Sequence, residues 1–277
     1  MNKIYPERPG FPRMLDASVL KYIAVVTMLI DHAALCLIYN MILKPAAPIS
    51  RGTQLYSLYL FYKFLRGVGR LAFPIFCFFL VEGFRYTRSR KKYALRLFLF
   101  GLISEVPFDL CSKLTFPNHM HQNVMFELLM GVIMLSAWEY FEHRKSQDIA
   151  EPDAERESET DAPKSSPAPS LFQNVQILTL LQVLSAAACM AAAQFLHLDY
   201  GYKGLGLILV LYLLQYDRLI QCAAGAVVIG IWELPAVLSF LLLFFYSGKR
   251  GKQSRYFFYA FYPAHLLLLY GISRLMP

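Results

Sequence analysis

The sequence predicts an all-α fold, a polytopic integral membrane helical bundle with about nine transmembrane helices. Hydrophobic residues make up 57% of its 277 positions, whereas about 45–50% is typical of soluble domains. Long apolar runs recur along nearly the whole chain. Segments of about ten residues with alternating polarity, which would indicate a membrane β-barrel, do not occur in the sequence.

The apolar runs place the expected spans in order along the chain. A helix that crosses the hydrocarbon core needs about 20 residues. We predict spans at 14–40, 66–84, 95–112, 123–141, 174–196, 203–216, 219–232, 234–247 and 256–274. The short pair 219–232 and 234–247 is also compatible with one helical hairpin or a re-entrant element.

Basic residues between the spans indicate the orientation. "RYTRSRKKYALR" (Arg85 to Arg96) holds six Lys or Arg residues and "GKRGKQSR" (Gly248 to Arg255) holds four. Cytoplasmic loops carry an excess of such residues. With nine spans and a cytoplasmic N-terminus, both clusters are cytoplasmic, so we expect a multi-pass protein of the inner (cytoplasmic) membrane. These loops explain the net charge of +8, and we expect the lipid bilayer but no nucleic acid as a partner.

Residues 143–170, "HRKSQDIAEPDAERESETDAPKSSPAPS", interrupt the apolar pattern. They are rich in Glu, Asp, Ser and Pro, a composition typical of disordered segments. We therefore expect 1–142 to form an N-terminal half of the bundle with four spans. Residues 143–170 would be a disordered acidic cytoplasmic linker, and 171–277 the C-terminal half with about five spans.

Cysteine and histidine spacing gives no support for a metal site. The five cysteines fall in or beside apolar runs without C-x-x-C spacing, which indicates small buried hydrophobes rather than disulfides or ligands. His119 and His121 form an H-x-H pair in a loop, but no third ligand lies nearby in the sequence. Walker, G-x-S-x-G and H-E-x-x-H motifs do not occur.

The first span, "LKYIAVVTMLIDHAAL", contains Lys21, Asp31 and His32. Each ionisable residue costs about 2.5–3.5 kcal/mol at mid-bilayer. On a helix Lys21 and His32 share one face about 16 Å apart, whereas Asp31 points about 80° away from Lys21. Lys21 can snorkel to the headgroups, and His32 can be a satisfied interior histidine. For His32, which lies deep and beside an aspartate, we favour a functional role.

Two arginines in "FLRGVGRLAFPIFCFFLVEGF" stand at i and i+4. On one helix face Arg66 and Arg70 repel unless an anion lies between them. Internal carboxylates supply one explanation, structural ion pairs. A phosphate or oxyanion site is the other, because guanidinium groups suit both phosphate and carboxylate. The residues alone leave both open.

Further polar residues interrupt the later spans. A single one of them is compatible with a helix-packing hydrogen bond, but their number favours a polar cavity. They are Glu82, Glu105, Asp109, Asn123, Glu127, Asp199 and Tyr200 in "DYGYKG", Glu233 and His265.

Six stretches of the chain together resemble the TraX family: "LKYIAVVTMLIDH", "LRGVGRLAFPIFCFFLVEGFRYT", "YALRLFLFGLISEVPFDL", "QNVMFELLMG", "DYGYKGLG" and "FFYAFYPAHLLLL". The resemblance runs from about Leu20 to Leu269, interrupted by the acidic segment. It implies an integral membrane protein related to those linked to N-terminal acetylation of conjugative pilin. It also places the chain near the transmembrane acyltransferase families, whose basic residue, ten residues and histidine match Lys21 and His32. Their two arginines are separated by two residues, whereas three separate Arg66 and Arg70.

The resemblance implies an acyl-CoA-dependent O- or N-acyltransferase that uses acetyl-CoA as acyl donor and no metal. His32 is the expected general base, with Asp31, Glu82 or Glu127 as candidates to orient its ring. Lys21 or an arginine would stabilise the oxyanion. The acetyl-CoA phosphates would meet Arg66, Arg70 and Arg85. The candidate substrate-binding residues are Glu82, Glu105, Asn123, Glu127, Tyr200 and His265, the last being also the second candidate for the base.

Two other function classes remain open from the sequence. A proton-coupled secondary transporter also uses intramembrane Asp, Glu and His residues, and Pro74 and Pro235 mark possible helix breaks. A non-catalytic assembly subunit would pair all its charges. The acceptor of an acyltransferase can be a protein N-terminus, a peptide, a sugar or a small amine, and no residue in the sequence chooses among them.

Overall fold

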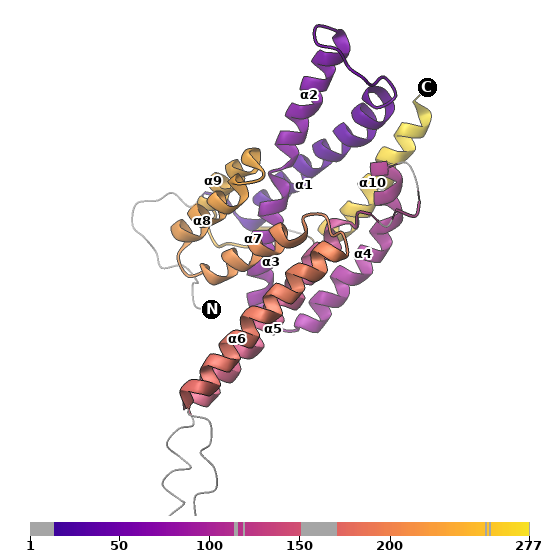
Figure 1. The fold of residues 1–277 in the computed structure, drawn as a ribbon. Coiled ribbons are helices and arrows are strands. Elements are labelled where there is room, and N and C mark those ends of the chain that lie inside the picture. The colour runs from indigo at the N-terminus through magenta and orange to yellow at the C-terminus, as the bar shows by residue number, and fades with distance from the viewer. Residues whose placement is uncertain are drawn as a thin grey trace, which may run out of the picture.

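The computed structural model describes residues 14–113, 116–118, 120–150, 171–252, 254 and 256–276. Within these residues the chain forms helices and their connections (Figure 1), with two isolated β-bridges and no strand of any length. The predicted all-α class is therefore confirmed.

The first long helix packs against the two α-helices that follow it in the chain. α1 (Ala17–Ala33) starts at Asp16, whose side chain accepts a hydrogen bond from the Val19 N–H, and continues without a break into the π-helix η1 (Ala34–Leu43). α2 (Gln54–Gly69) starts at Thr53 in the same way. α3 (Ala72–Tyr86) follows after two residues. These N-caps satisfy backbone N–H groups that a helix leaves unpaired.

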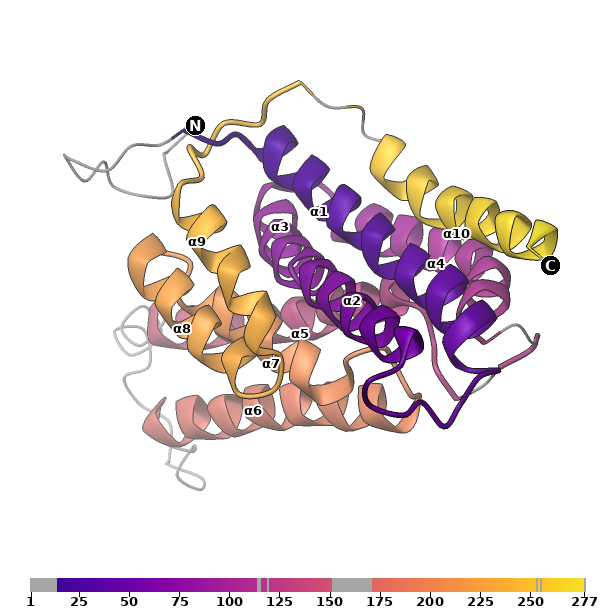
Figure 2. The ribbon, with the colours of Figure 1, turned by 90° about the horizontal axis from the view of Figure 1, so that it is seen from above.

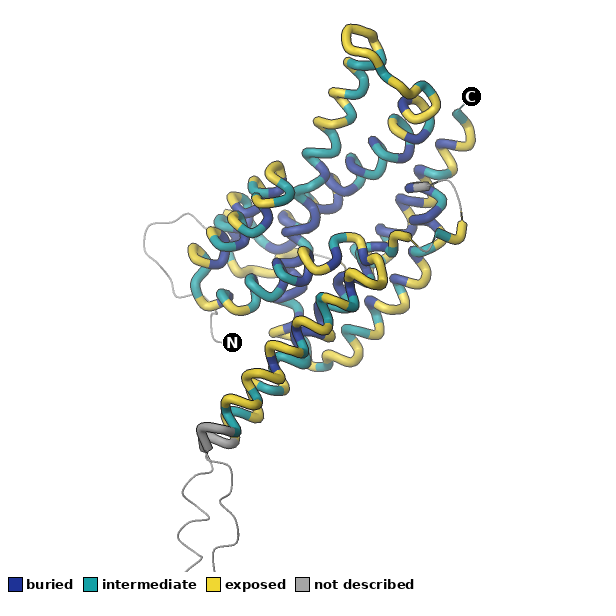
Figure 3. Tube along the Cα trace, in the orientation of Figure 1, coloured by how far each residue is buried: buried dark blue, intermediate teal, exposed yellow. Residues whose placement is uncertain are grey.

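Two pairs of long helices pack beside this group. α4 (Arg90–Lys113) packs against α10 (Phe257–Leu275), and α5 (Val124–Ala150) packs along α6 (Leu171–Phe195). Figures 1 and 2 show α10 next to α4, and Figure 1 shows the α5–α6 hairpin extending away from the other helices. Figure 3 shows that buried positions gather where α1 and α3 meet their neighbours, while α6 is mostly exposed.

Short helices complete the bundle. α7 (Gly201–Leu213) packs against α3, α5 and α6. α8 (Arg218–Gly230), capped by Asp217, packs against the 3₁₀-helix η2 (Leu234–Val237) and α9 (Leu238–Phe244). A helix of 13 residues is about 20 Å long, which is shorter than a hydrocarbon core of about 30 Å. The dimensions therefore favour the helical hairpin that the sequence allowed for 219–247.

Four helical stretches are long and apolar enough to cross a membrane: Ala17–Leu43, Gln54–Tyr86, Val124–Gln147 and Asn174–Phe195. α6 exposes Ile177, Leu180 and Val183, side chains that lipid would cover. The protein is thus a helical bundle with several apolar helices able to span a membrane. The count of nine spans and the cytoplasmic N-terminus remain predictions.

Two predicted boundaries differ from the structure. The span predicted at 66–84 contains the junction between α2 and α3, and α2 begins twelve residues before it at Gln54. The tyrosines and the lysine of "QLYSLYLFYKF" lower the apolarity of this segment, so the apolar pattern did not predict a helix there. Residues 143–150 continue α5, while the rest of the expected linker, 151–170, lies outside the described residues.

Candidate functional site

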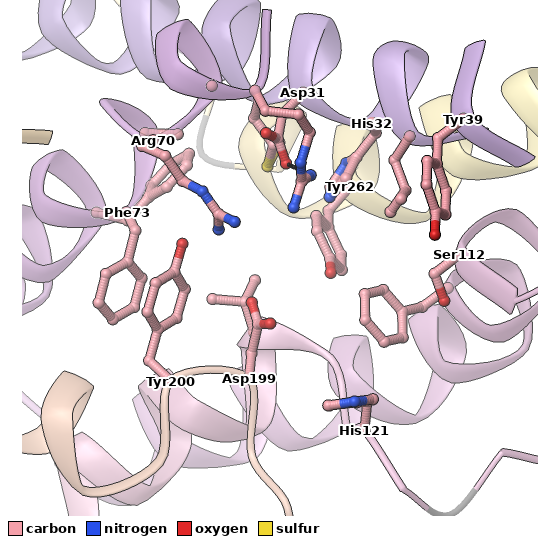
Figure 4. A pocket seen from close by; sticks show the side chains of 18 of the residues that line it. Asp31, His32, Tyr39, Arg70, Phe73, Ser112, His121, Asp199, Tyr200 and Tyr262 are labelled. Carbon is pink, nitrogen blue, oxygen red and sulfur yellow. Dashed lines mark hydrogen bonds and ion pairs between the residues drawn. The ribbon is translucent and has the colours of Figure 1, made fainter. Parts of the chain in front are cut away.

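A cavity of about 490 Å³ lies among α1, η1, the α2–α3 junction, the C-terminal end of α4, the loop before α7, and α10. Ligand pockets in proteins typically measure about 300–1,000 Å³. Figure 4 shows side chains from several elements pointing into this space. The polar residues of its wall are Asp31, His32, Tyr39, Asn40, Lys44, Arg66, Arg70, Ser112, His121, Asp199, Tyr200 and Tyr262.

A histidine pair forms part of this wall. His32 Nδ1 lies 2.7 Å from His265 Nε2, and His265 Nδ1 lies 2.7 Å from the Phe261 carbonyl oxygen. The two imidazole rings stack with centroids 5.0 Å apart, and Tyr262 meets both rings edge-on. His265 is 3% exposed, so His32 is the member of the pair that faces the cavity.

The hydrogen bonds fix the tautomers of a neutral pair. A carbonyl oxygen accepts and never donates, so the Nδ1–H of His265 donates to Phe261 and its Nε2 carries the lone pair. That lone pair accepts the Nδ1–H of His32. The Nε2 of His32 is therefore the unprotonated nitrogen, which is the form that a general base requires.

Both cavity arginines are paired with carboxylates. The Nη1 of Arg66 forms an ion pair with Asp31 Oδ2, and Arg70 Nε lies 3.4 Å from Glu233 Oε2. Gly69 permits the first contact, because a Cβ there would collide with the Asp31 side chain. The ion-pair alternative thus holds for both arginines. Both also line the cavity, so the pairing does not exclude anion binding.

The loop before α7 supplies the opposite wall. Tyr200 stacks on Phe73 with ring centroids 3.5 Å apart and planes at 8°, and Trp232 lies 5.6 Å from it. Its hydroxyl interacts with Arg70. Asp199 points into the cavity (Figure 4). Burial by the surrounding protein raises the pKa of Asp199 to about 6, and the Arg70 guanidinium opposes this rise.

The π-helix η1 shapes the far end of the cavity. Leu35, Tyr39, Asn40 and Lys44 all line it, and the Lys44 N–H donates to the Tyr39 carbonyl oxygen at 2.8 Å. Residues nine positions apart lie about 180° apart on an α-helix. They lie only about 20° apart at the roughly 4.4 residues per turn of a π-helix. The π geometry therefore brings Leu35 and Lys44 to one face.

Three of the predicted residues lie away from the cavity. Lys21 Nζ is 4.9 Å from the Phe79 ring centroid, and Arg85 stands 5.1 Å above Tyr216. Glu82 accepts a 3.4 Å hydrogen bond from Tyr246. Lys21 and His32 do lie on the same helix, but neighbouring aromatic rings enclose the Lys21 end.

Three other predicted residues lie behind the wall. Glu105 accepts a hydrogen bond from the Asn123 amide, which also donates to the Gly101 carbonyl oxygen at 2.9 Å. Glu127 accepts from the Gly201 N–H at 3.1 Å. None of them lines the cavity. Among the described residues, the side chain in hydrogen-bond contact with His32 is His265, and not Asp31, Glu82 or Glu127.

Several wall residues were not among the predicted site residues. Asp199 precedes the predicted residue Tyr200 in "DYGYKG". A carboxylate that interrupts an apolar stretch could have identified it as a site residue. Tyr39 and Tyr262 gave no such signal, since tyrosine is enriched at both membrane–water interfaces, and Asn40 is the last residue of the first predicted span. His119 lies outside the described residues. In the described part of the chain, no three His, Cys, Asp or Glu side chains group closely enough to hold a metal ion.

Comparison with known proteins extends over nearly the whole chain. Residues 16–273 match the sequence profile of the family described as TraX protein. The chain is 29% identical over 288 residues to the probable fimbrial assembly protein FimC, serogroup H1, of Dichelobacter nodosus, covering 93% of this chain and 96% of that protein. No solved structure matches the chain significantly. Since the profile covers every helix of the cavity, this protein belongs to the TraX family.

Proposed function

We propose that the protein is an integral membrane acetyltransferase that moves an acetyl group from acetyl-CoA to an amine or hydroxyl acceptor within the cavity. The observation that carries the proposal is the histidine pair. In a neutral pair the unprotonated nitrogen belongs to His32, and His32 lines the cavity together with two arginines. A neutral imidazole can accept a proton and a guanidinium group can stabilise an oxyanion, and acyl transfer from a thioester needs both.

In the proposed reaction each of these residues has a role, and protons and charges balance at every step. His32 Nε2 takes the proton of the acceptor as its nitrogen or oxygen attacks the thioester carbonyl carbon. The resulting imidazolium keeps its Nδ1–H bond to His265, which disperses the positive charge. As the carbon–sulfur bond breaks, the His32 proton passes to the CoA sulfur. Arg70 stabilises the developing oxyanion, while Asp31 holds Arg66 in place.

The wall opposite the arginines favours an amine acceptor. Asp199 presents a carboxyl group to the cavity, and a carboxylate attracts an ammonium group more strongly than a neutral hydroxyl. The ammonium releases one proton to water to give the neutral amine, whose nitrogen then attacks while His32 takes the next proton. Because a relative carries the name of a fimbrial assembly protein, fimbrial subunit chains are the first acceptors to test.

The test measures thiol release from acetyl-CoA by purified protein in detergent, with membrane extracts and fimbrial subunits as acceptor sources. We expect turnover above background in the wild type and a loss of about 10²–10⁴-fold in His32→Ala. His143→Ala is the matched control, since His143 lies exposed on α5 far along the hairpin.

Two results would overturn the proposal. One is equal turnover in His32→Ala and the wild type. The other is no turnover with any acceptor source, together with no thermal stabilisation by CoA. That second result would favour the proton-coupled transporter, for which the same carboxyl and histidine groups would serve as a proton relay.

A further inference from the structure

Glu127 is a buried carboxyl group that no step of the proposed chemistry uses. It lies on α5, is 0% exposed, and does not line the cavity. Its Oε2 accepts the hydrogen bond of the Gly201 N–H at 3.1 Å. Its Oε1 is buried with no hydrogen-bond partner among the described residues. Burying a carboxyl group is costly, so a specific benefit must offset this cost.

The bond of Glu127 holds the loop that forms one wall of the cavity. Gly201 is the first residue of α7 and has a positive φ of 58°, a conformation that glycine adopts without strain. The residue before it is Tyr200, which stacks on Phe73 and whose hydroxyl interacts with Arg70. A continuous series of contacts therefore runs from Glu127 through the Gly201 amide and Tyr200 to the Arg70 guanidinium.

Gly204 makes room for this arrangement. A Cβ at Gly204 would collide with Glu127 Oε1, and it would lie 2.8 Å from Tyr200 Cβ and 2.9 Å from Phe73 Cζ. Two residues further along the same helix, a Cβ at Gly206 would meet nothing within 4 Å. Carboxyl group, tyrosine and phenylalanine thus pack closely around one glycine, while the neighbouring glycine faces open space.

We infer that Glu127 is a positioning residue, which acts through the Gly201 amide and Tyr200 to hold Arg70 at the cavity wall. What Arg70 acts on rests on the proposed function, but the positioning itself does not. Glu127→Gln keeps an oxygen that accepts the Gly201 N–H. Glu127→Leu has a similar volume and removes the acceptor, leaving that amide unpaired.

The first test monitors the position of the loop that carries Tyr200, and it needs no substrate. The chain has two tryptophans, so Trp138→Phe leaves Trp232, 5.6 Å from Tyr200, as the single reporter. In that background we expect Glu127→Leu and Gly204→Ala to shift the Trp232 emission and increase its quenching by acrylamide. Glu127→Gln and the control Gly206→Ala should match the parent. Identical spectra for Glu127→Leu and the parent would overturn the inference.

The second test separates positioning from loss of folded protein. Misfolding lowers kcat through the active fraction and leaves KM unchanged. Displacement of Arg70 raises KM for acetyl-CoA or lowers kcat/KM by about tenfold or more. We expect this change in Glu127→Leu and wild-type values in Glu127→Gln. Adding Glu127→Leu to Arg70→Ala should cause no further loss of kcat/KM. If Glu127→Leu lowers kcat/KM by the same factor in the wild type and in Arg70→Ala, the inference is contradicted.

The two tests fail separately from the proposed function. A wild type without acetyl-CoA turnover would end the acetyltransferase proposal, yet the Trp232 spectra would still decide whether Glu127 holds the loop. A wild type with turnover, combined with unchanged Trp232 spectra and unchanged KM in Glu127→Leu, would end the positioning inference alone.

Discussion

Two groups of ionisable residues lie within the helical body, and they differ in what surrounds them. The cavity group consists of Asp31, His32, Arg66, Arg70 and Asp199, all of which border open space. The Lys21 group consists of Lys21, Glu82, Arg85 and Arg218, which lie against aromatic rings. In that second group, cation-to-centroid distances are 4.9 Å for Lys21 over Phe79, 5.1 Å for Arg85 over Tyr216 and 4.9 Å for Arg218 over Tyr246.

The difference shows how similar residue types take different roles. A cation over an aromatic face gains roughly 0.5–2 kcal/mol and needs no ligand to offset its charge. In the cavity group, Asp31 pairs with Arg66 and Arg70 pairs with Glu233. Asp31 and both arginines nevertheless line the cavity. Convergent polar groups on the wall of a cavity are typical of a ligand-binding site. Aromatic rings cover the cations of the Lys21 group, whereas a ligand in the cavity can contact the cavity group.

The largest effect on this comparison should come from Gly69→Ala. The new Cβ would collide with the Asp31 side chain, and overpacking of this kind costs about 1–3 kcal/mol. We expect a lower Tm in detergent and at least a tenfold loss of acetyl transfer, since the Asp31–Arg66 pair must move. The matched control is Gly67→Ala, where the Cβ would meet Pro235 at an ordinary 3.7 Å. Equal effects of the two substitutions would contradict the packing described for the cavity wall.

A smaller effect is expected from Asp199→Asn, and it should depend on pH. Asp199 has a pKa raised from 3.8 to about 6 by burial, so its carboxylate exists mainly above pH 6. We expect the KM for an amine acceptor to rise as the pH falls through about 6 in the wild type. In the variant, KM should be roughly tenfold higher at pH 8 and insensitive to pH in this range.

Stability gives an independent check on Asp199. A carboxyl group whose pKa is raised on folding favours the folded state at low pH, and this contribution is lost as the pH rises through about 6. Asp199→Asn should therefore raise Tm relative to the wild type at pH 8, with the difference shrinking below pH 6. A difference that grows toward low pH would show that the assigned direction is incorrect.

The smallest effect should come from Lys21→Met. Its side chain lies against Phe79 and Phe258 and does not line the cavity. We expect kcat and KM to change less than about threefold, with any change in Tm arising from lost cation–π contacts. A loss of kcat comparable with that of His32→Ala would show that Lys21 takes part in the reaction, and it would contradict the distinction between the two groups.

The sequence indicated which residues of the first span are unusual, but it did not indicate which residues from different helices contact each other. The apolar runs predicted the helical membrane class, and rare charges in the first span singled out Asp31 and His32. The partner of His32 was not accessible in this way. His265 is 233 positions away, and helical spacing relates residues within one helix only. The same spacing placed Lys21 and His32 on one face but could not show that Phe79 and Phe258 cover Lys21.

The two remaining differences also have local causes. The π-helix η1 changes which residues share a face, so α-helical spacing misplaces Lys44 relative to Leu35. The junction between α2 and α3 falls at Arg70 and Leu71, inside a stretch whose apolarity reads as one continuous span. In both places a deviation from the regular α-helix positions residues of the cavity wall.

The most direct measurement for this account is a double-mutant cycle on the histidine pair, with thiol release from acetyl-CoA as the readout. Because His265 acts through the Nδ1–H of His32, the two residues should behave as a unit. We predict that His32→Ala and the double variant His32→Ala/His265→Ala have the same residual rate, while His265→Ala alone slows the reaction by about 10–100-fold. A double variant slower than His32→Ala by that same factor, or a His265→Ala variant with wild-type turnover, would contradict the central role of the pair.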